Sequence, residues 1–206
     1  MQLRSSSERG FTLIEVLITI SLMGVVSLAL SDLVIGALKQ MSATSARMDV
    51  SQDEQLGGAY FARDVAALGL RDYGAAIGGE SLPFKPSIQL DAADDAGGTT
   101  CGPVPVSVLR LLSDDWNISV TPAVRRTAVV AYYLKQMGEV LELHRARCVG
   151  SSVVVSDVVL SGNVKPGSVA VTCSTPCTAP VAPLSLQLRY SSGDYQVVLS
   201  GLRRQS

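Results

Sequence analysis

An uninterrupted apolar segment near the start of the chain constrains its fold more than any other feature. Residues 11–30 are hydrophobic or small hydroxyl residues, apart from Gly24 and one charged residue, Glu15. A helix of this length rises about 30 Å, which matches the hydrocarbon core of a bilayer. The sequence therefore predicts a membrane-spanning helix.

The residues before the segment indicate its orientation and its processing. Arg4 and Arg9 precede it, so the positive-inside rule predicts a cytoplasmic N-terminus and an external C-terminal part. A secretory signal peptide would end in a small-residue cleavage site beyond the apolar run, and residues 27–29 do not clearly supply one. Gly10 instead stands before the run, where cleavage would leave the helix attached and expose Phe11 as a new N-terminus.

The sequence Arg-Gly-Phe-Thr-Leu-Ile-Glu-Val at residues 9–16 resembles the class III signal shared by type IV pilins and type II secretion pseudopilins. In that family a membrane peptidase cleaves after the residue matching Gly10 and N-methylates the residue matching Phe11, and the acid matching Glu15 guides assembly. The resemblance implies these roles here. It also implies four partners: prepilin peptidase, other pilins or pseudopilins, an inner-membrane assembly platform with its motor ATPase, and membrane lipid.

Physical chemistry gives Glu15 a separate significance. An acidic side chain inside a membrane helix costs about 2.5–3.5 kcal/mol on insertion scales unless it finds a partner. Glu15 lies about one helical turn from Phe11, so in a staggered stack of helices it would meet the N-terminal amine of a neighbouring subunit. The alternative is an ordinary anchor in which an acid near the interface is tolerated by snorkelling.

Helical periodicity continues beyond the apolar segment, with no proline before Pro83. We expect a leader at 1–10, a membrane or filament-core half of the helix at 11–38 and an amphipathic half at 39–73, ending near residues 70–74. The pair Gly57-Gly58 is expected to bend or soften it.

Residues 74–105 are rich in Gly, Ala, Asp and Pro and predict a long loop. Its aspartates at 91, 94 and 95 raise a calcium hypothesis, but their spacing is not that of an EF-hand and a solvated acidic loop is favoured.

Residues 106–206 are expected to form a β-rich head. Short β-branched or alternating runs predict strands at 106–112, 128–134, 140–147, 153–160, 169–173, 184–190 and 195–199. Turns at 136–139 and 191–194 predict hairpins. The predicted fold class is α+β and pilin-like, with the long helix packed against an antiparallel sheet.

Four cysteines lie in the part predicted to be outside the membrane, where disulfides persist. They are Cys101, Cys148, Cys173 and Cys177. The Ser-Thr-Pro spacer between the last two would suit a small closed loop and leave the first two to pair, but four cysteines allow three pairings and the sequence does not choose. Zinc binding at 173–177 is the rival, less favoured interpretation.

Nothing in the sequence indicates catalysis. It lacks the Gly-x-Ser-x-Gly, phosphate-loop and His-Glu-x-x-His motifs, so we expect no enzyme, no metal and no cofactor. Its single histidine, His144, is expected to be a polar surface residue. The net charge of −1 and the scattered arginine pairs at 125–126, 145/147 and 203–204 do not favour nucleic-acid binding, although they do not exclude it. These arginine pairs are expected to occupy solvated edge or strand positions.

Further resemblance narrows the expected role. Residues 30–33 lack the helix-kinking proline that major pilins often carry, whereas residues 60–69, with Arg63-Asp64 and a following glycine, resemble W-type minor pilins and J-type pseudopilins. We therefore expect a minor pilin-like subunit of a type IV pilus, in a tip or priming complex. The alternatives are a minor pseudopilin of type II secretion and a membrane-anchored extracytoplasmic binding module. The expected location is the inner membrane and then a periplasmic or extracellular filament.

Overall fold

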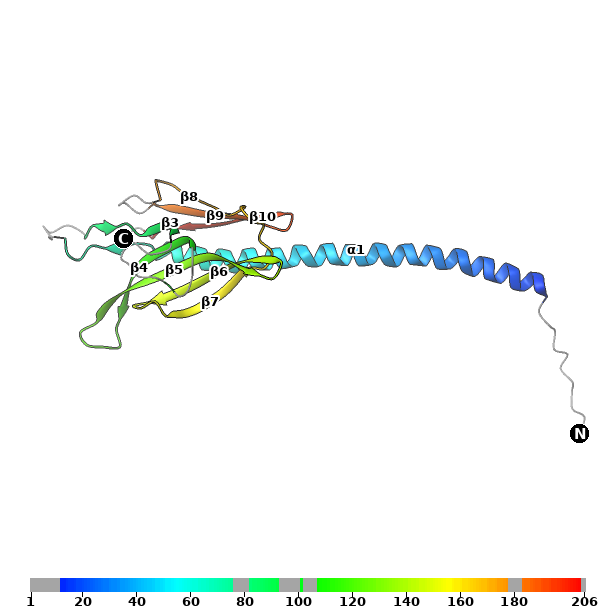
Figure 1. Ribbon diagram of the computed structural model, residues 1–206, viewed down its shortest axis with the longest axis horizontal. Coiled ribbons are helices and arrows are strands. Elements are labelled where there is room, and N and C mark those ends of the chain that lie inside the picture. Colours follow the sequence, from blue (N-terminus) through cyan, green and yellow to red (C-terminus); the bar gives the residue numbers. More distant parts are fainter. Residues whose placement is uncertain (1–11, 76–81, 93–100, 102–106, 178–182, 205–206) are drawn as a thin grey trace, which may run out of the picture. The chain divides into compact units, whose positions relative to one another are not determined.

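The computed structural model describes residues 12–75, 82–92, 101, 107–177 and 183–204 (Figure 1). The described part has one long helix followed by strands, which confirms the predicted α+β class. The elements are α1 (Leu13–Ala66), β1 (Leu70–Arg71), β2 (Phe84–Lys85), β3 (Ile88–Ala92), β4 (Ser107–Asn117), β5 (Val124–Met137), β6 (Val140–Val149), β7 (Val154–Ser161), β8 (Ala170–Cys173), β9 (Ser185–Ser192) and β10 (Tyr195–Leu202). The chain divides into two compact units, Met1–Met48 and Asp49–Ser206.

The first unit contains the N-terminal part of α1. Every residue from Thr12 to Met48 is exposed. In the second unit, α1 continues without a break through Gly57-Gly58, where the sequence predicts a bend or a softer helix. The expected division of the helix at residue 38 is a functional one and stays a prediction.

The helix ends earlier than the predicted 70–74. After Ala66 the chain turns tightly, and the N–H of Leu68 donates to the carbonyl of Val65 rather than to that of Asp64. Gly69 then adopts a φ of 135°, a conformation that favours glycine, and its N–H donates to the carbonyl of Leu112 in β4. Pairing with the sheet therefore replaces the next helical turn.

The strands form three antiparallel sheets rather than the single sheet expected. β3-β4-β5-β6-β7 is the largest, β10-β9-β8 is separate, and β1 pairs with β2. All seven predicted strands are present, as are the hairpin turns at Gly138 and Gly193, both with positive φ.

The expected loop at 74–105 is not a loop throughout, because it contains β2 and β3. β3 pairs antiparallel with β4, and Ile88 opposite Leu111 is only 2% exposed. Burial at this sheet edge outweighs the loop-like composition of the surrounding residues. Residues 76–81, 93–100 and 102–106 lie outside the described part, so the loop prediction is not tested there.

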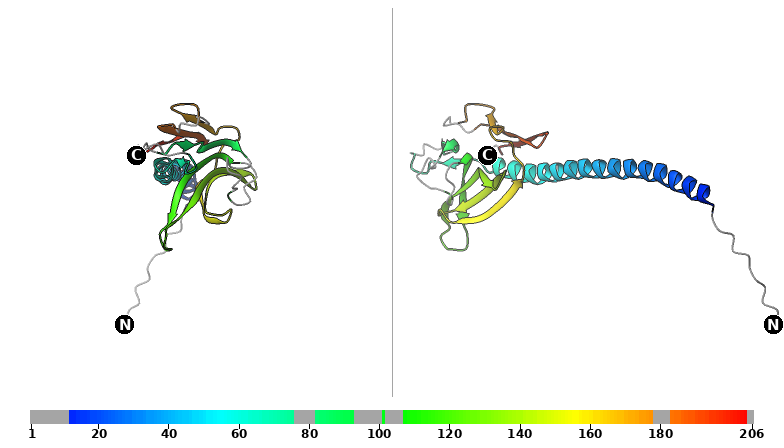
Figure 2. Two further views of the ribbon diagram at one scale, coloured as in Figure 1. Left: turned by 90° about the vertical axis from the view of Figure 1, so that its left-hand side faces the viewer. Right: turned by 45° about the vertical axis from the view of Figure 1, so that its right-hand side comes forward.

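The main core of the head lies between the end of α1 and the two larger sheets (Figure 2). Phe61 and Val65 are fully buried and pack with alternate residues of β4, β5 and β6 and with residues of β9 and β10. The other face of β4–β6 carries a second cluster that includes Val129, Tyr133 and Cys148. Alternation along the strands thus supplies both clusters from the same sheet.

Candidate functional site

The apolar end of α1 holds the residue with the strongest predicted role. Glu15 lies in the first turn, its N–H donates to the carbonyl of Thr12 at 3.0 Å, and its side chain is exposed. Gly10 and Phe11, the predicted processing and methylation residues, lie outside the described residues. The structure therefore places Glu15, the predicted assembly acid, on a helix but gives no geometry for the predicted cleavage site.

Hydroxyl side chains in this part of α1 are satisfied by the helix itself. Thr19 donates to the carbonyl of Val16, Ser21 to that of Leu17 and Ser27 to that of Met23, at 2.8–2.9 Å. These groups consequently need no water in an apolar surrounding. Glu15 is the one ionisable residue of the sequence between 12 and 31.

The length and composition of α1 suit a membrane span, and the segment concerned is not buried within the structure. The family model for the prokaryotic N-terminal methylation motif matches residues 5–31. This motif is the one that type IV pilins and pseudopilins carry, and it supports a place for the chain in that family. No curated protein and no solved structure gives a significant match to the chain.

The motif and the apolar helix bear on several of the coarser expectations. Pilins and pseudopilins form a structural family, and the motif implies processing by prepilin peptidase and assembly with other pilins. The apolar N-terminal helix fits a membrane-anchored pilin. The motif is common to pili and secretion systems, and it does not distinguish the W and J types.

A buried ion pair connects α1 to the five-stranded sheet in the head. The guanidinium of Arg145 in β6 donates to both carboxylate oxygens of Asp64, from Nε at 2.6 Å and from Nη2 at 2.7 Å. The hydroxyl of Tyr132 in β5 donates to the same carboxylate at 2.7 Å. Asp64 and Arg145 are 7% and 1% exposed, so this network is shielded from solvent.

The electrostatics of the network favour an ion pair with a neutral tyrosine. Burial raises the pKa of Tyr132 well above its usual value, and the adjacent negative charge of Asp64 adds to the effect. Burial alone would lower the pKa of Arg145, but the hydrogen bonds and charge of Asp64 outweigh it and raise that pKa. The network joins the helix to the sheet.

The expectation that the pair at 145/147 lies in a solvated strand position is wrong for Arg145. The alternation of β6 directs it to the same face as Leu143, toward α1. A sequence signal for its partner exists, because Asp64 occupies the same helical stripe as Phe61, Val65 and Leu68. A charge within an apolar stripe predicts a buried counter-charge.

The expectation that His144 lies on the surface is also wrong, because it is only 5% exposed. Its Nε2 lies 2.9 Å from Glu142 and its Nδ1 3.3 Å from Asp157. Tyr133 donates to Asp157 at 2.7 Å, and burial followed by this hydrogen bond raises the tyrosine's pKa. The imidazole ring of His144 packs against the ring of Tyr133, and this contact explains why His144 is buried on a face that was expected to be solvated.

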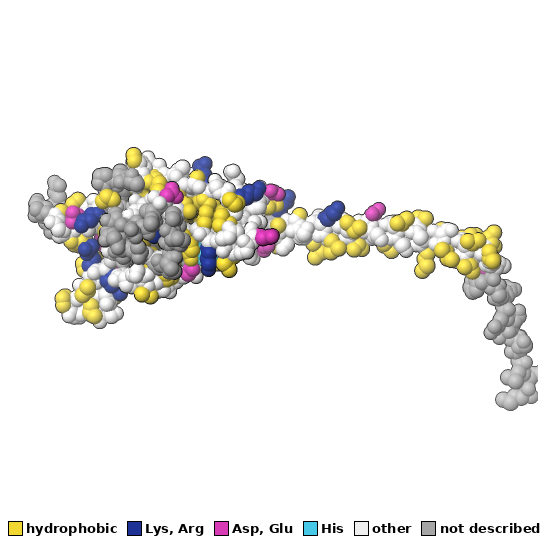
Figure 3. All heavy atoms as spheres, viewed as in Figure 1, with side chains coloured by type: hydrophobic (Ala, Val, Ile, Leu, Met, Phe, Trp, Pro, Cys, Tyr) yellow, Lys and Arg dark blue, Asp and Glu magenta, His cyan; other side chains and the backbone are white. Residues whose placement is uncertain are grey.

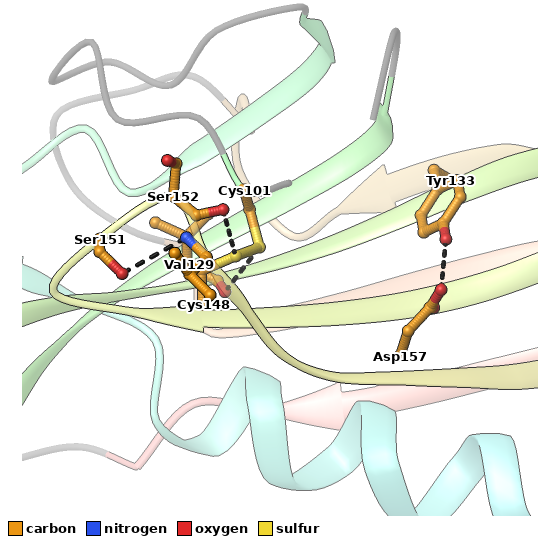
Figure 4. Close-up of a disulfide and its surroundings, with 8 residues drawn as sticks. Cys101, Val129, Tyr133, Cys148, Ser151, Ser152 and Asp157 are labelled. Carbon is orange, nitrogen blue, oxygen red and sulfur yellow. Dashed lines mark hydrogen bonds between the residues drawn. A yellow bond between two sulfur atoms is a disulfide. The ribbon is translucent and has the colours of Figure 1, made fainter. Parts of the chain in front are cut away.

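The four cysteines form two disulfides, Cys101–Cys148 and Cys173–Cys177. Figure 4 shows the first, with Sγ of Cys101 3.8 Å from the carbonyl oxygen of Val129 in β5. It joins a residue of the predicted long loop to β6. Because Cys173 and Cys177 are bonded to each other, they supply no thiolate for the zinc interpretation.

The calcium hypothesis gains no support from the described residues. Asp91 lies in β3 with a φ of 47°, while Asp94 and Asp95 lie outside the described part. No metal-binding group of three or more His, Cys, Asp or Glu residues occurs among the residues that the structure describes.

Proposed function

We propose that this chain is a minor pilin-like structural subunit of a type IV pilus, assembled through α1 in a tip or priming complex. The observation that carries the proposal is the placement of Glu15, the single ionisable residue of an otherwise apolar helical segment within the matched methylation motif. Its proposed partners are other pilins and the inner-membrane assembly platform.

Glu15 supplies the specificity of assembly in this proposal. Cleavage after Gly10 creates a positively charged amine on Phe11, which N-methylation leaves charged. One helical turn separates this amine from Glu15, so neighbouring helices must be staggered for the two charges to meet. Leaving the acid unpaired costs about 2.5–3.5 kcal/mol, and this cost favours the staggered arrangement over others.

The composition and bonding of the head support a structural role outside the cytoplasm. The buried charges of Asp64 and Arg145 are paired with each other, and the two disulfides suit an oxidising compartment. Arg4 and Arg9 before the helix favour an N-in, C-out topology in the inner membrane, followed by transfer to a periplasmic or extracellular filament.

The proposed processing is tested by intact mass and N-terminal sequencing of the membrane-extracted chain, in cells with and without prepilin peptidase. We expect a start at N-methyl-Phe11 only when the peptidase is present, and no cleavage of a Gly10→Leu variant. A Glu15→Gln variant should be cleaved normally but should fail to enter sheared filaments. A full-length chain in every strain would contradict the proposal.

A minor pseudopilin of type II secretion is the second candidate, because the matched motif and the resemblance at residues 60–69 are common to both systems. Deletion of the gene distinguishes them. Loss of surface pili with normal export of folded proteins supports the pilus role, while the opposite pattern supports secretion.

A further inference from the structure

The β4–β5 hairpin extends beyond the sheet to which it belongs. β3 pairs with β4 as far as Leu111, and β6 pairs with β5 only from Ala128 onward. Residues 114–117 of β4 and 124–127 of β5 therefore pair with each other as a two-stranded ribbon. It is the green hairpin that extends below the β4 label in Figure 1.

The end of this ribbon is apolar and open to solvent. Residues 117–124, Asn-Ile-Ser-Val-Thr-Pro-Ala-Val, contain no charge. Ile118 is 83% exposed, Val124 52%, Trp116 48% and Val120 43%. Figure 3 shows hydrophobic side chains gathered on this projection. Such exposure is costly in water, so the tip has the character of a binding surface.

Charged pairs stabilise the neck of the ribbon immediately behind the tip. Arg125 donates to Asp114 at 2.9 Å, and Nε of Arg126 donates to Asp115 at 3.0 Å. Arg125 also lies over the ring of Tyr73, 4.5 Å from its centroid, and that ring contacts Trp116 edge-on. An isolated two-stranded ribbon is marginal, so these contacts hold the tip away from the sheet.

Polarity changes along the ribbon from its end toward the sheet. Ile118 and Val120 lie at the end, Trp116 and Arg125 lie directly opposite each other behind them, and Asp115 with Arg126 and then Asp114 follow. A bilayer has the same order of hydrocarbon, interface and headgroups, and tryptophan favours its interface. The neck carries two positive and two negative charges, which complement zwitterionic headgroups carrying phosphate and ammonium. The side chains of Arg125 and Arg126 are 36% and 38% exposed, so they remain open to such contacts.

We propose that the tip of the β4–β5 hairpin inserts shallowly into a zwitterionic lipid bilayer, with Ile118 and Val120 in the acyl region and Trp116 at the interface. The inference is independent of the proposed assembly role, because it involves neither Glu15 nor the motif.

The chain contains a single tryptophan, so Trp116 fluorescence reports on the tip alone. The full mature chain is held by its own helix in nanodiscs of ordinary phosphatidylcholine, and vesicles of brominated phosphatidylcholine are added. Insertion should shift the Trp116 emission to shorter wavelength, quench it, and protect it from acrylamide.

The variant Ile118→Asp/Val120→Asp keeps the fluorophore and should lose the shift and the quenching. Val153→Asp is the matched control, because Val153 is an equally accessible valine, 69% exposed and outside the ribbon; it should behave as the unaltered chain. Lipid exchange between discs and vesicles is the same in all three proteins and cannot produce a difference between them. The midpoint of thermal unfolding of each variant establishes that the head is folded.

Four results would overturn the inference. Unchanged emission of the unaltered chain with vesicles excludes insertion. Quenching that is equal in the Ile118→Asp/Val120→Asp variant assigns it to another surface. A shift that grows with protein concentration in the absence of vesicles, or one that requires anionic lipid and disappears with salt, indicates protein contact or arginine-driven adsorption instead.

Discussion

At the scale of single residues, Asp64 and Arg145 form a buried charged link between helix and sheet. Each is buried, and each satisfies the other with two hydrogen bonds. Removal of one partner leaves an uncompensated buried charge, a loss that exceeds the net contribution of the intact pair.

We predict that Arg145→Met lowers the free energy of unfolding of the head by about 3–5 kcal/mol. Arg63→Ala is the control, because Arg63 approaches Asp64 only at 3.8 Å and its side chain is 64% exposed; a change below about 1 kcal/mol is expected. Urea unfolding followed by far-UV circular dichroism measures both. Equal losses in the two variants would show that the buried pair has no special role.

Asp53 gives the head a pH dependence. Burial raises its pKa above the ordinary value of 3.8, the hydrogen bond to Ser161 opposes this, and the charge of Asp49 adds to it. Burial, followed by the charge of Asp53, also raises the pKa of the adjacent Tyr190 to about 12. A carboxyl whose folded pKa is raised stabilises the fold when protonated, and this stabilisation is lost as pH rises through the folded pKa.

The Asp53→Asn variant should therefore be more stable than the unaltered head at pH 7, by roughly 1–2 °C in melting temperature. The gain should shrink as pH falls below the raised pKa of Asp53, because the aspartate is then neutral as well. Melting temperatures of both proteins across this range measure the difference. A gain that is larger in acid than at pH 7 would contradict the assignment.

At the scale of elements, β10 approaches α1 so closely that a glycine is required at the contact. A Cβ added to Gly201 would lie 2.6 Å from Cβ of Val65, a position fixed by the helix. Gly58 in the same helix has open space around it. The two glycines therefore have opposite consequences for substitution.

We predict that Gly201→Ala destabilises the head by about 1–3 kcal/mol through overpacking. Gly58→Ala should stabilise it by about 0.5–1 kcal/mol, because alanine restricts the unfolded chain without a clash. Denaturant midpoints of the two variants give the comparison. Stabilisation by Gly201→Ala would mean that β10 is free to move away from the helix.

The two disulfides close loops of very different length, with sequence separations of 47 and 4. In the chain-entropy model the longer loop is worth about 4 kcal/mol and the shorter about 2 kcal/mol. Cys101→Ala/Cys148→Ala should lower the melting temperature more than Cys173→Ala/Cys177→Ala. The reverse order would indicate that strain or residual structure outweighs loop entropy.

At the scale of the whole molecule, the anchor and the head are separate units with separate chemistry. Glu15 and the methylation motif lie in the first, and the buried ion pair and disulfides lie in the second. Substitutions in one unit should therefore leave the other intact.

We predict that Glu15→Gln leaves the melting temperature of the head unchanged and lowers the amount of the subunit in sheared filaments. If the pair between Glu15 and the neighbouring amine is worth about 1.4 kcal/mol, its loss corresponds to a tenfold decrease in the amount of subunit in the filaments. Immunoblots of filament and membrane fractions measure the second effect. A lower melting temperature with normal incorporation would reverse the assigned roles.

Most of the correct predictions about the head came from the periodicity of residues close together in the sequence. The seven strands of the head follow β-branched alternation, and their hairpins follow the glycines at 138 and 193. The errors occur where a distant partner decides the outcome. Composition predicted a loop around Ile88, but β4 supplies a paired edge there, and Arg145 resembled a solvated charge because Asp64 is 81 residues away.

The sequence by itself determined the apolar helical segment, the methylation motif and the resemblance to type IV pilins and pseudopilins, because each depends on residues within one short segment. Only the tertiary structure decided the disulfide pairing, the division into sheets, the end of α1 at Ala66 and the projection of the β4–β5 ribbon. These depend on the register between segments far apart in the chain. The register between strands is the one that leaves the fewest hydrogen-bonding groups and charges unpaired over the whole head. A short stretch of sequence does not contain that information.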